Sequence, residues 1–400
     1  MRTIILIFRG ELTGGAKESE IRGRYWPIVT DLPIAHHRLR NQRLTGPPFE
    51  KPEQVVRWLT AVQSQDYAGA KWAIAQRVKQ VADDEIDKLF NAGRILRTHV
   101  MRPTWHFVMP ADIRWVLKLT GPRVNAVSAY YYRKLELDEA LFRRSNAAIT
   151  KALRGGTQLT RTELAKILKR AGIDAAGVRL AYLILRAELD AVVCSGGLRG
   201  KQFTYAFLDE RVPKCTTLER EEALAELTRR YFTSHGPALL RDYTWWSGLT
   251  AADAKAGIEM ARPHLDQWTV DGKTYWFGEL GATAKTRAPL IHLLPNYDEY
   301  LIAYKDRSNS IDPSLQKHSG TSDGVFNAHI IVLNGQVIGG WRRTIEKDKV
   351  TITANPLMGL GNAEQRALRQ AAERYGEFLG KSAVSLEVHK SGPYAPSKVN

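Results

Sequence analysis

Short helical segments followed by two strand-like runs occur three times along this chain, and this repeated order limits the fold more than any other feature of the sequence. In the first unit, apolar residues at helical spacing predict helices over 52–62 and 70–78 and a third helix that begins at Asp83. Strand-like runs follow over 95–100 and 104–108. Three short helices followed by a two-stranded hairpin are typical of a winged helix-turn-helix unit.

The second unit repeats this order. Thr160 and Glu163 form a capping box, which predicts the start of a helix. Another helix is predicted from about residue 178, and strand-like runs on either side of the turn at 195–201 predict a hairpin. The glycines of this turn do not form a phosphate-binding P-loop, because Gln202 stands where that motif requires Ser or Thr.

The third unit begins near Leu218. One helix is predicted to end at His235-Gly236-Pro237, a second begins at Ala238, and Thr250 opens a third. Strand-like runs over 268–270 and 274–277 are joined through Asp271-Gly272, which is a strong signal for a hairpin turn.

From about residue 285 the sequence is rich in strands. The strongest hairpin signal of the chain is Asn334-Gly335, between strands predicted over 329–333 and 337–341. An amphipathic helix is predicted over 362–379. A small β-barrel or curved sheet with one helix fits this pattern.

We therefore predict an α+β fold with three tandem winged helix-turn-helix units around a C-terminal β-barrel-like domain. The predicted segments are a loose N-terminal extension at 1–30, winged units at 31–145, 146–215 and 216–284, and the barrel-like domain at 285–395.

The charge of the chain favours a polyanionic partner. Lys and Arg total 58 against 42 Asp and Glu, a net charge of +16 that is spread along the chain. Such a balance indicates nucleic acid first and an anionic membrane second. Two cysteines exclude a disulfide framework and favour a reducing cytoplasm, and no apolar run approaches the length of a membrane span. We expect a cytoplasmic, nucleoid-associated monomer with no protein partner.

Motifs of the common enzyme classes are missing from the sequence. Its ten histidines show no metal-ligand spacing, and neither a Gly-x-Ser-x-Gly elbow nor a dinucleotide fingerprint occurs. The sequence therefore predicts no metal and no cofactor.

One polar cluster stands where the first predicted helix ends. Gln63 and Gln65 are two residues apart, and side chains at this spacing point the same way from extended backbone. Together with Asp66 they would bring two carboxamides and a carboxylate to one small volume. The alternative is that they are ordinary polar residues at a helix end.

Other polar residues accompany aromatic ones. Arg102, Thr104, Trp105 and His106 lie in the first predicted hairpin, where Trp105 and His106 could equally belong to the core. Asp298 and Glu299 follow a buried strand and could be functional, although capping of a helix is the favoured reading. Basic residues at predicted hairpin tips could contact phosphates: Arg199, Lys201, Arg342 and Arg343.

Taken together, these motifs resemble the bacterial alkylpurine DNA glycosylases of the AlkZ/YcaQ type, also described as winged-helix DNA-binding-domain proteins. The resemblance covers about residues 31–395. It is carried by the segments 61–72, Arg97-Thr98-His99 through Thr104-Trp105-His106, His235-Gly236-Pro237, Trp245-Trp246-Ser247-Gly248-Leu249, and Leu294-Pro295 with Asp298-Glu299. It implies three winged helices around a β-barrel, and an active-site pair that falls on Gln63 and Gln65. Ser64 departs from the family pattern, because the best-known members carry an apolar residue between the pair.

The chemistry suits these residues. A carboxamide cannot remove a proton from water at neutral pH, but it can orient a water molecule through hydrogen bonds. That is sufficient when the leaving group is an N7-alkylated purine, because its positive charge already weakens the glycosidic bond. A nearby carboxylate such as Asp66 would favour the positive charge that develops on the sugar.

The hypothesis is a monofunctional DNA glycosylase acting on N-alkylated (N7 or N3) purines in double-stranded DNA, with unhooking of interstrand crosslinks as an open extension. Gln63, Gln65 and Asp66 would be catalytic, and five residues would shape the pocket: His99, Arg102, Thr104, Trp105 and His106. No lysine is assigned as a Schiff-base nucleophile. The rival readings are a non-enzymatic winged-helix regulator and a basic protein bound to RNA or the nucleoid.

Overall fold

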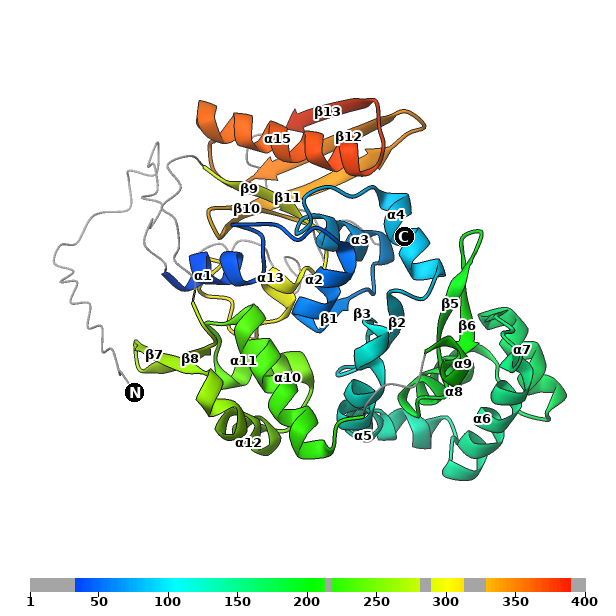
Figure 1. Cartoon of the computed structure of the whole chain (residues 1–400). Coiled ribbons are helices and arrows are strands. Elements are labelled where there is room, and N and C mark those ends of the chain that lie inside the picture. The colour runs from blue at the N-terminus through cyan, green and yellow to red at the C-terminus, as the bar shows by residue number, and fades with distance from the viewer. Residues whose placement is uncertain (1–32, 213–216, 281–288, 313–328, 390–400) are drawn as a thin grey trace.

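The computed structural model describes residues 33–212, 217–280, 289–312 and 329–389 of the chain (Figure 1). The predicted extension at 1–30 lies outside these residues. Over the part that is described, no helix is both long enough and apolar enough to cross a membrane.

The first unit carries the Gln-x-Gln segment on a short strand. Helix α2 ends at Leu59, earlier than predicted, because Thr60 adopts φ 68 and breaks the helical path. Residues Ala61–Gln63 then form the strand β1 at the edge of a three-stranded sheet of order β1-β3-β2. The elements of this unit are α1 (Pro33–Asn41), α2 (Pro52–Leu59), β1 (Ala61–Gln63), α3 (Tyr67–Ala75), α4 (Asp83–Asn91), β2 (Leu96–His99) and β3 (Trp105–Val108).

Two helices connect this unit to the second. These are α5 (Pro110–Lys134) and α6 (Glu139–Leu153), and α6 was not predicted from the sequence. The buried residues of α6 are nevertheless at helical spacing: Phe142, Ser145, Ile149 and Leu153. The predicted domain boundary between residues 145 and 146 falls inside α6.

The second unit contains the predicted capping box and hairpin. The Thr160 hydroxyl accepts from the backbone N–H of Glu163 at 3.3 Å, and the Glu163 carboxylate accepts from the N–H of Thr160 at 2.7 Å. Its sheet has the order β4-β6-β5. The elements are β4 (Leu159–Thr160), α7 (Arg161–Arg170), α8 (Gly177–Leu189), β5 (Val193–Arg199), β6 (Gln202–Phe207) and α9 (Leu208–Arg211).

The third unit has a simpler sheet. A two-stranded hairpin joins through Asp271-Gly272 as predicted, and a single bridge pairs Ala238 with Trp276. The elements are α10 (Arg220–His235), α11 (Leu240–Ser247), α12 (Ala251–Ala261), the 3-10 turn η1 (Arg262–His264), β7 (Asp266–Val270) and β8 (Lys273–Phe277). The description of all three units as winged helix-turn-helix domains stays a prediction, as do the domain boundaries.

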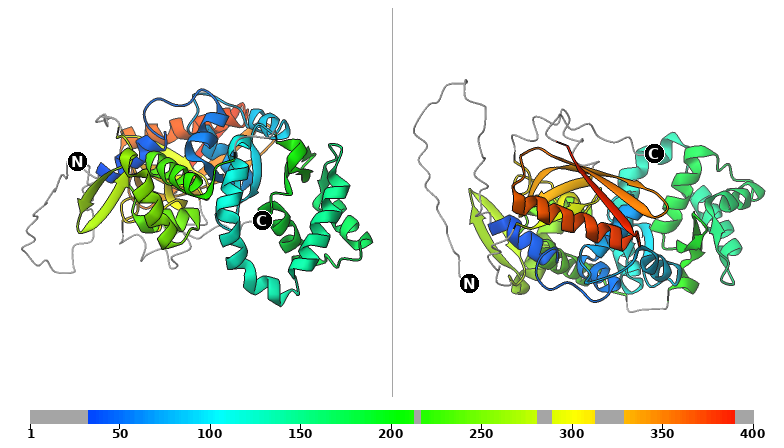
Figure 2. Two further views of the ribbon diagram at one scale, coloured as in Figure 1. Left: turned by 60° about the horizontal axis from the view of Figure 1, so that its bottom comes forward. Right: turned by 90° about the horizontal axis from the view of Figure 1, so that it is seen from above.

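The C-terminal part is a curled sheet of order β13-β12-β11-β10-β9, with α15 lying across one face (Figure 2). The sheet is a half-barrel whose described edge strands are β9 and β13. Asn334 and Gly335 adopt φ values of 49° and 89° in the turn between β10 and β11, as a tight hairpin requires. The elements are β9 (Ile291–Leu294), α13 (Glu299–Ile302), β10 (His329–Leu333), β11 (Gln336–Ile345), β12 (Lys349–Pro356), α15 (Asn362–Phe378) and β13 (Ala383–Val388).

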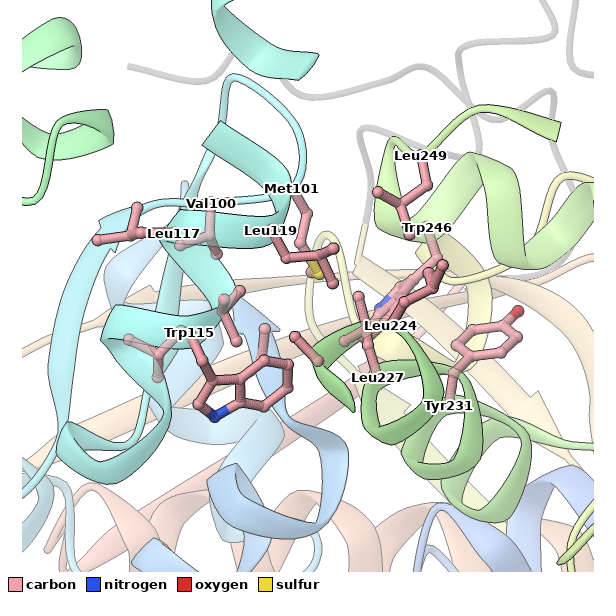
Figure 3. Close-up of a cluster of buried hydrophobic side chains, with 14 of the residues drawn as sticks. Val100, Met101, Trp115, Leu117, Leu119, Leu224, Leu227, Tyr231, Trp246 and Leu249 are labelled. Carbon is pink, nitrogen blue, oxygen red and sulfur yellow. The ribbon is translucent and has the colours of Figure 1, made fainter. Parts of the chain in front are cut away.

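Two shared cores hold these parts together. The Trp72 ring of α3 packs 4.9 Å from Tyr375 and 5.2 Å from Phe378 of α15, and its indole N–H donates to the Leu293 carbonyl at 2.7 Å. A second core joins α5 to α10 and α11, with Trp115, Leu227 and Trp246 among its members (Figure 3). The short strand β1 takes part in both, because Ala61 belongs to one core and Val62 to the other.

Candidate active site

Gln63 lies on the edge strand β1, and both its side chain and its backbone N–H form hydrogen bonds to residues of other elements. It is 6% exposed, and its register partner on β3 is His106. The Gln63 side-chain oxygen accepts from Arg102 Nη2 at 2.9 Å. Its backbone N–H donates to Glu299 Oε1 at 3.1 Å, across 236 residues of sequence. The amide that the Gln-x-Gln pattern singles out is therefore fixed by two residues from other elements.

Glu299 is fully buried, at 0% exposure, and three elements meet at its carboxylate. Its Oε2 atom lies 3.0 Å from the indole N–H nitrogen of Trp246 and 3.3 Å from His235 Nε2. The favoured helix-cap reading is correct for Asp298, which accepts from the Tyr300 N–H at 2.9 Å. It is wrong for Glu299, because the side chain turns away from its own helix toward Gln63.

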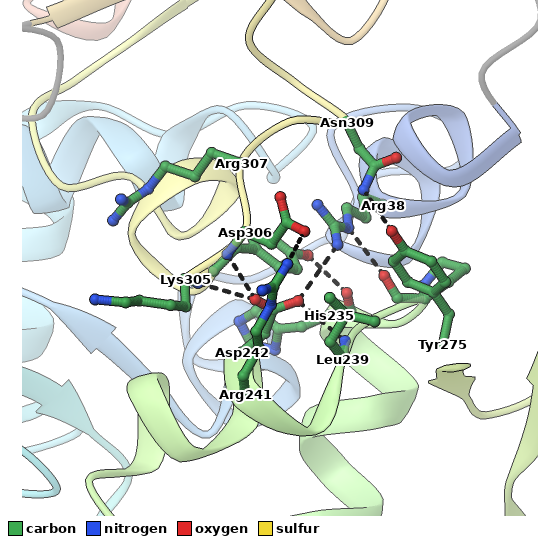
Figure 4. Close-up of polar contacts among 12 residues, drawn as sticks. Arg38, His235, Leu239, Arg241, Asp242, Tyr275, Lys305, Asp306, Arg307 and Asn309 are labelled. Atoms are coloured by element: carbon green, nitrogen blue, oxygen red, sulfur yellow. Dashed lines mark hydrogen bonds and ion pairs between the residues drawn. The ribbon is translucent and has the colours of Figure 1, made fainter. Parts of the chain in front are cut away.

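The segment after Glu299 is fixed by a second buried carboxylate, Asp242 of α11 (Figure 4). Asp242 Oδ1 accepts from the backbone N–H groups of Lys305 and Asp306 at 3.0 and 2.8 Å, and Oδ2 lies 3.7 Å from Arg38 Nη2. Burial raises the pKa of Asp242 despite the nearby Arg38 guanidinium. These contacts tie the chain that follows α13 to α11, which also carries Trp246.

The other two predicted catalytic residues occupy different environments. Gln65 is exposed. Asp66 is half-buried and caps α3, with Oδ1 accepting from the Gly69 N–H at 3.0 Å. Gly69 is required there, because a Cβ at this position would lie 2.6 Å from Asp66 Oδ2. Asp66 thus has a structural role beside any catalytic one.

Ser64, between the two glutamines, is fully buried. Its backbone N–H donates to the Trp105 carbonyl at 2.8 Å, and its own carbonyl accepts from Arg97 at 3.0 Å. The Ser64 hydroxyl has no hydrogen-bond partner among the described residues. An apolar side chain would fit this environment better, so nothing in the structure explains the hydroxyl.

The predicted pocket residues divide between the two faces of the first sheet. Gln63, His106 and Thr98 are register partners across its three strands and therefore share one face. His99 and Trp105 are partners on the opposite face, with ring centroids 4.4 Å apart. The structure therefore does not gather all of these residues around one volume.

On the His99 face, buried charges are held by aromatic rings. The Arg97 guanidinium lies 4.4 Å from the Trp105 ring and 4.5 Å from the Phe203 ring, and burial lowers its pKa to about 10. His99 Nδ1 contacts the carboxylate of Glu188, which is buried on α8. Glu188 was not predicted from sequence, since its partner lies 89 residues away.

His106 is fully buried, and burial and then the Arg102 charge keep its pKa well below the usual value. Its ring is therefore neutral near pH 7. Because Nδ1 lies 2.9 Å from the Thr104 carbonyl, the proton belongs on Nδ1. Nε2 is then an acceptor, and like the Thr104 hydroxyl it has no partner among the described residues.

Arg102 extends from a loop that passes close to the backbone of Gly248. Burial lowers the pKa of Arg102, and Glu299 opposes that effect. Gly248 adopts φ +71, and a Cβ there would lie only 2.1 Å from the Met101 carbonyl oxygen. The glycine allows the loop to approach α11 closely enough for Arg102 to reach Gln63.

The residues predicted to contact phosphates lie in different surroundings. Arg199 pairs with Glu163 at 2.8 Å, whereas Lys201 is exposed at the β5–β6 turn. The prediction that Arg342 and Arg343 occupy a hairpin tip is wrong, because β11 continues to Ile345. Arg342 is exposed within that strand, and Arg343 lies against Trp341 and 2.7 Å from His329 Nε2. No cluster of three His, Cys, Asp or Glu residues that could bind a metal ion occurs in the described ranges.

Comparison with known proteins bears on this site. Residues 56–378 match the family model described as DNA glycosylase AlkZ-like. Among solved structures, the fold is similar to that of the Streptomyces sahachiroi DNA glycosylase AlkZ, with a TM-score of 0.73 and 20% sequence identity over 89% of this chain and 98% of that chain. No curated protein sequence matches the chain significantly.

Proposed function

The chain belongs to the AlkZ-like DNA glycosylase family, and from this premise we propose that it hydrolyses the N-glycosidic bond of N7- and N3-alkylated purines in duplex DNA. The observation that carries the proposal is the buried amide of Gln63, fixed by Arg102 through its side chain and by Glu299 through its backbone. The rival reading as a non-enzymatic regulator is set aside, because the family is one of DNA glycosylases.

The reaction needs no acid to activate the leaving group. The N9–C1′ bond breaks and its electron pair stays with the purine, which changes from a cation to a neutral base. The oxygen of a water molecule bonds to C1′, and the proton it loses passes to solvent. Because the alkyl group supplies the driving force for departure, the protein has only to orient the water and stabilise the cationic sugar.

We assign these two tasks to neighbouring residues. The Gln63 oxygen accepts one hydrogen bond from Arg102, and its second lone pair can accept a hydrogen of the water. The exposed Gln65 can accept a hydrogen of the same water through its side-chain oxygen. The Asp66 carboxylate contributes negative charge near the sugar while its Oδ1 atom caps α3.

DNA binding is proposed for the three units that were predicted to be winged helix-turn-helix domains. In the first two units the order helix, strand, helix, helix, strand, strand and the sheet orders β1-β3-β2 and β4-β6-β5 support the winged helix-turn-helix reading. In the third unit, the Ala238–Trp276 bridge occupies the position of the missing strand. Phosphate contacts are proposed for four basic residues: Arg199, Lys201, Arg342 and Arg343. Unhooking of crosslinked purines would use the same chemistry.

The test is release of free base from a duplex that contains one N7-methylguanine. The wild type is compared with Gln63→Ala/Gln65→Ala at equal salt concentration. We expect release above the spontaneous rate for the wild type and none for the double variant, with DNA binding kept by both. Equal release by the two proteins would refute the assigned residues. No release by the wild type, from either N7-methylguanine or crosslinked DNA, would refute the proposed function.

A further inference from the structure

Glu299 and the neighbouring buried carboxylate Asp298 have different partners. Burying a carboxylate is costly unless it is paired or hydrogen-bonded. The neighbouring Asp298 meets this cost with Arg77, whose guanidinium donates to both of its oxygens at 2.9 and 2.8 Å. The Glu299 carboxylate instead contacts His235 Nε2 and the N–H groups of Trp246 and Gln63. Two adjacent buried carboxylates therefore face different parts of the protein.

From this arrangement we infer that Glu299 is a positioning residue of the glycosylase reaction, which fixes Gln63 and keeps the surroundings of its amide electrostatically balanced. The inference rests on the proposed function and adds a residue to it.

The first step of the argument concerns geometry. Gln63 is in the edge strand of its sheet, and its backbone N–H points away from β3 toward Glu299. A buried backbone N–H without an acceptor costs free energy, so Glu299 stabilises this position of the Gln63 backbone. With Glu299 in place, the Gln63 backbone is fixed on one side and its side-chain oxygen on the other by Arg102. A water molecule bound by the Gln63 amide is then placed by two contacts that the substrate does not supply.

The second step concerns charge. Arg102 donates to Gln63 and brings a positive charge beside an amide where, by the proposed reaction, positive charge develops on the sugar. Glu299 acts on Arg102 electrostatically and partly offsets that charge. Removing the charge of Glu299 would leave Arg102 uncompensated in a poorly solvated site, where such interactions are stronger than in water. The transition state should therefore lose more than DNA binding does.

The experiment compares Glu299→Gln, Glu299→Asp and the matched control Asp298→Asn with the wild type. The probe is the N7-methylguanine duplex, with enzyme in excess, so that the single-turnover rate constant and the enzyme concentration at half-saturation are obtained separately. We expect Glu299→Gln to lower the rate constant at least tenfold with half-saturation unchanged. Glu299→Asp, which keeps the charge, should recover part of that loss. Asp298→Asn should lower the unfolding midpoint and leave the rate constant of the folded protein within twofold.

A wild-type rate constant in Glu299→Gln would overturn the inference, as would an equal loss in Asp298→Asn, which would make both carboxylates structural. If Glu299→Gln does not fold, the inference is tested with Glu299→Asp alone. A lower rate constant at unchanged half-saturation supports the inference, and a wild-type rate constant refutes it. If the wild type releases no base, both the proposed function and the inference are refuted. If the wild type releases base and the Glu299 substitutions leave the rate constant unchanged, only the inference is refuted.

Discussion

Asp66 has one observed role and one proposed role, which a pair of substitutions can separate. As the N-cap of α3 it accepts from the Gly69 N–H at 3.0 Å, and we propose that its half-buried carboxylate also supplies negative charge near the reacting sugar. Asn is about as good an N-cap as Asp, whereas Ala is not. Asp66→Asn should therefore remove the charge and keep the cap, and Asp66→Ala should remove both.

The sizes of the two effects follow from the environment of this carboxylate. Loss of an N-cap costs about 1 kcal/mol. For a chain of this length, with an unfolding entropy of about 2 cal/mol/K per residue, that lowers the melting temperature by only about 1 °C. A charge about 4 Å from a cation is worth roughly 1 kcal/mol in water and about 4 kcal/mol near a protein surface. Since Asp66 is partly exposed, we take the lower part of this range, which corresponds to about a tenfold change in rate.

The assay is single-turnover release of N7-methylguanine, with melting temperatures measured on the same samples. Both variants should lose about tenfold in rate, and only Asp66→Ala should lose stability. A wild-type rate in Asp66→Asn would refute the electrostatic role and leave Asp66 as a cap alone. A rate loss in Asp66→Ala only would mean that Asp66 acts by holding the start of α3.

Three further predictions concern stability and binding. Burial lowers the pKa of His292 to about 4, so as the pH falls below about 6.5 the unfolded chain takes up a proton at this residue before the folded chain does. Between pH 7.5 and 5.5, the free energy of unfolding measured in urea should therefore fall by about 1 kcal/mol more in the wild type than in His292→Gln. Equal losses in the two proteins would contradict a buried neutral ring. Gly248→Ala should destabilise the protein by about 2–4 kcal/mol in the same assay, because strain at φ +71 adds to the clash with Met101, and a loss below about 0.5 kcal/mol would show that the loop yields. Lys201→Ala should reduce the slope of log affinity against log salt by about 0.9, and an unchanged slope would remove it from the DNA interface.

The predictions that held depend on contacts within a few residues of sequence. The capping box of Thr160 and Glu163 and the turn at Asn334-Gly335 have the expected geometry, because their hydrogen bonds or backbone angles are set by adjacent residues. Two strands of the curled C-terminal sheet were likewise predicted from the strand-like runs on either side of this turn. Helix α6 shows the limit of this approach: its buried residues are at helical spacing, but one of them is the polar Ser145, and the helix was not predicted.

The candidate site shows the same division. The sequence singled out Gln63 and Gln65, since two carboxamides at this spacing are a local feature that chemistry can interpret. That Gln63 is buried and Gln65 exposed, that His99 and His106 occupy opposite faces of one sheet, and that Glu299 reaches Gln63 across 236 residues were decided only by the packing of distant elements. Hydrogen bonds between residues close in sequence can be predicted from the types of those residues. Contacts between helices and sheets depend on how whole surfaces fit, and no short stretch of this chain carries that information.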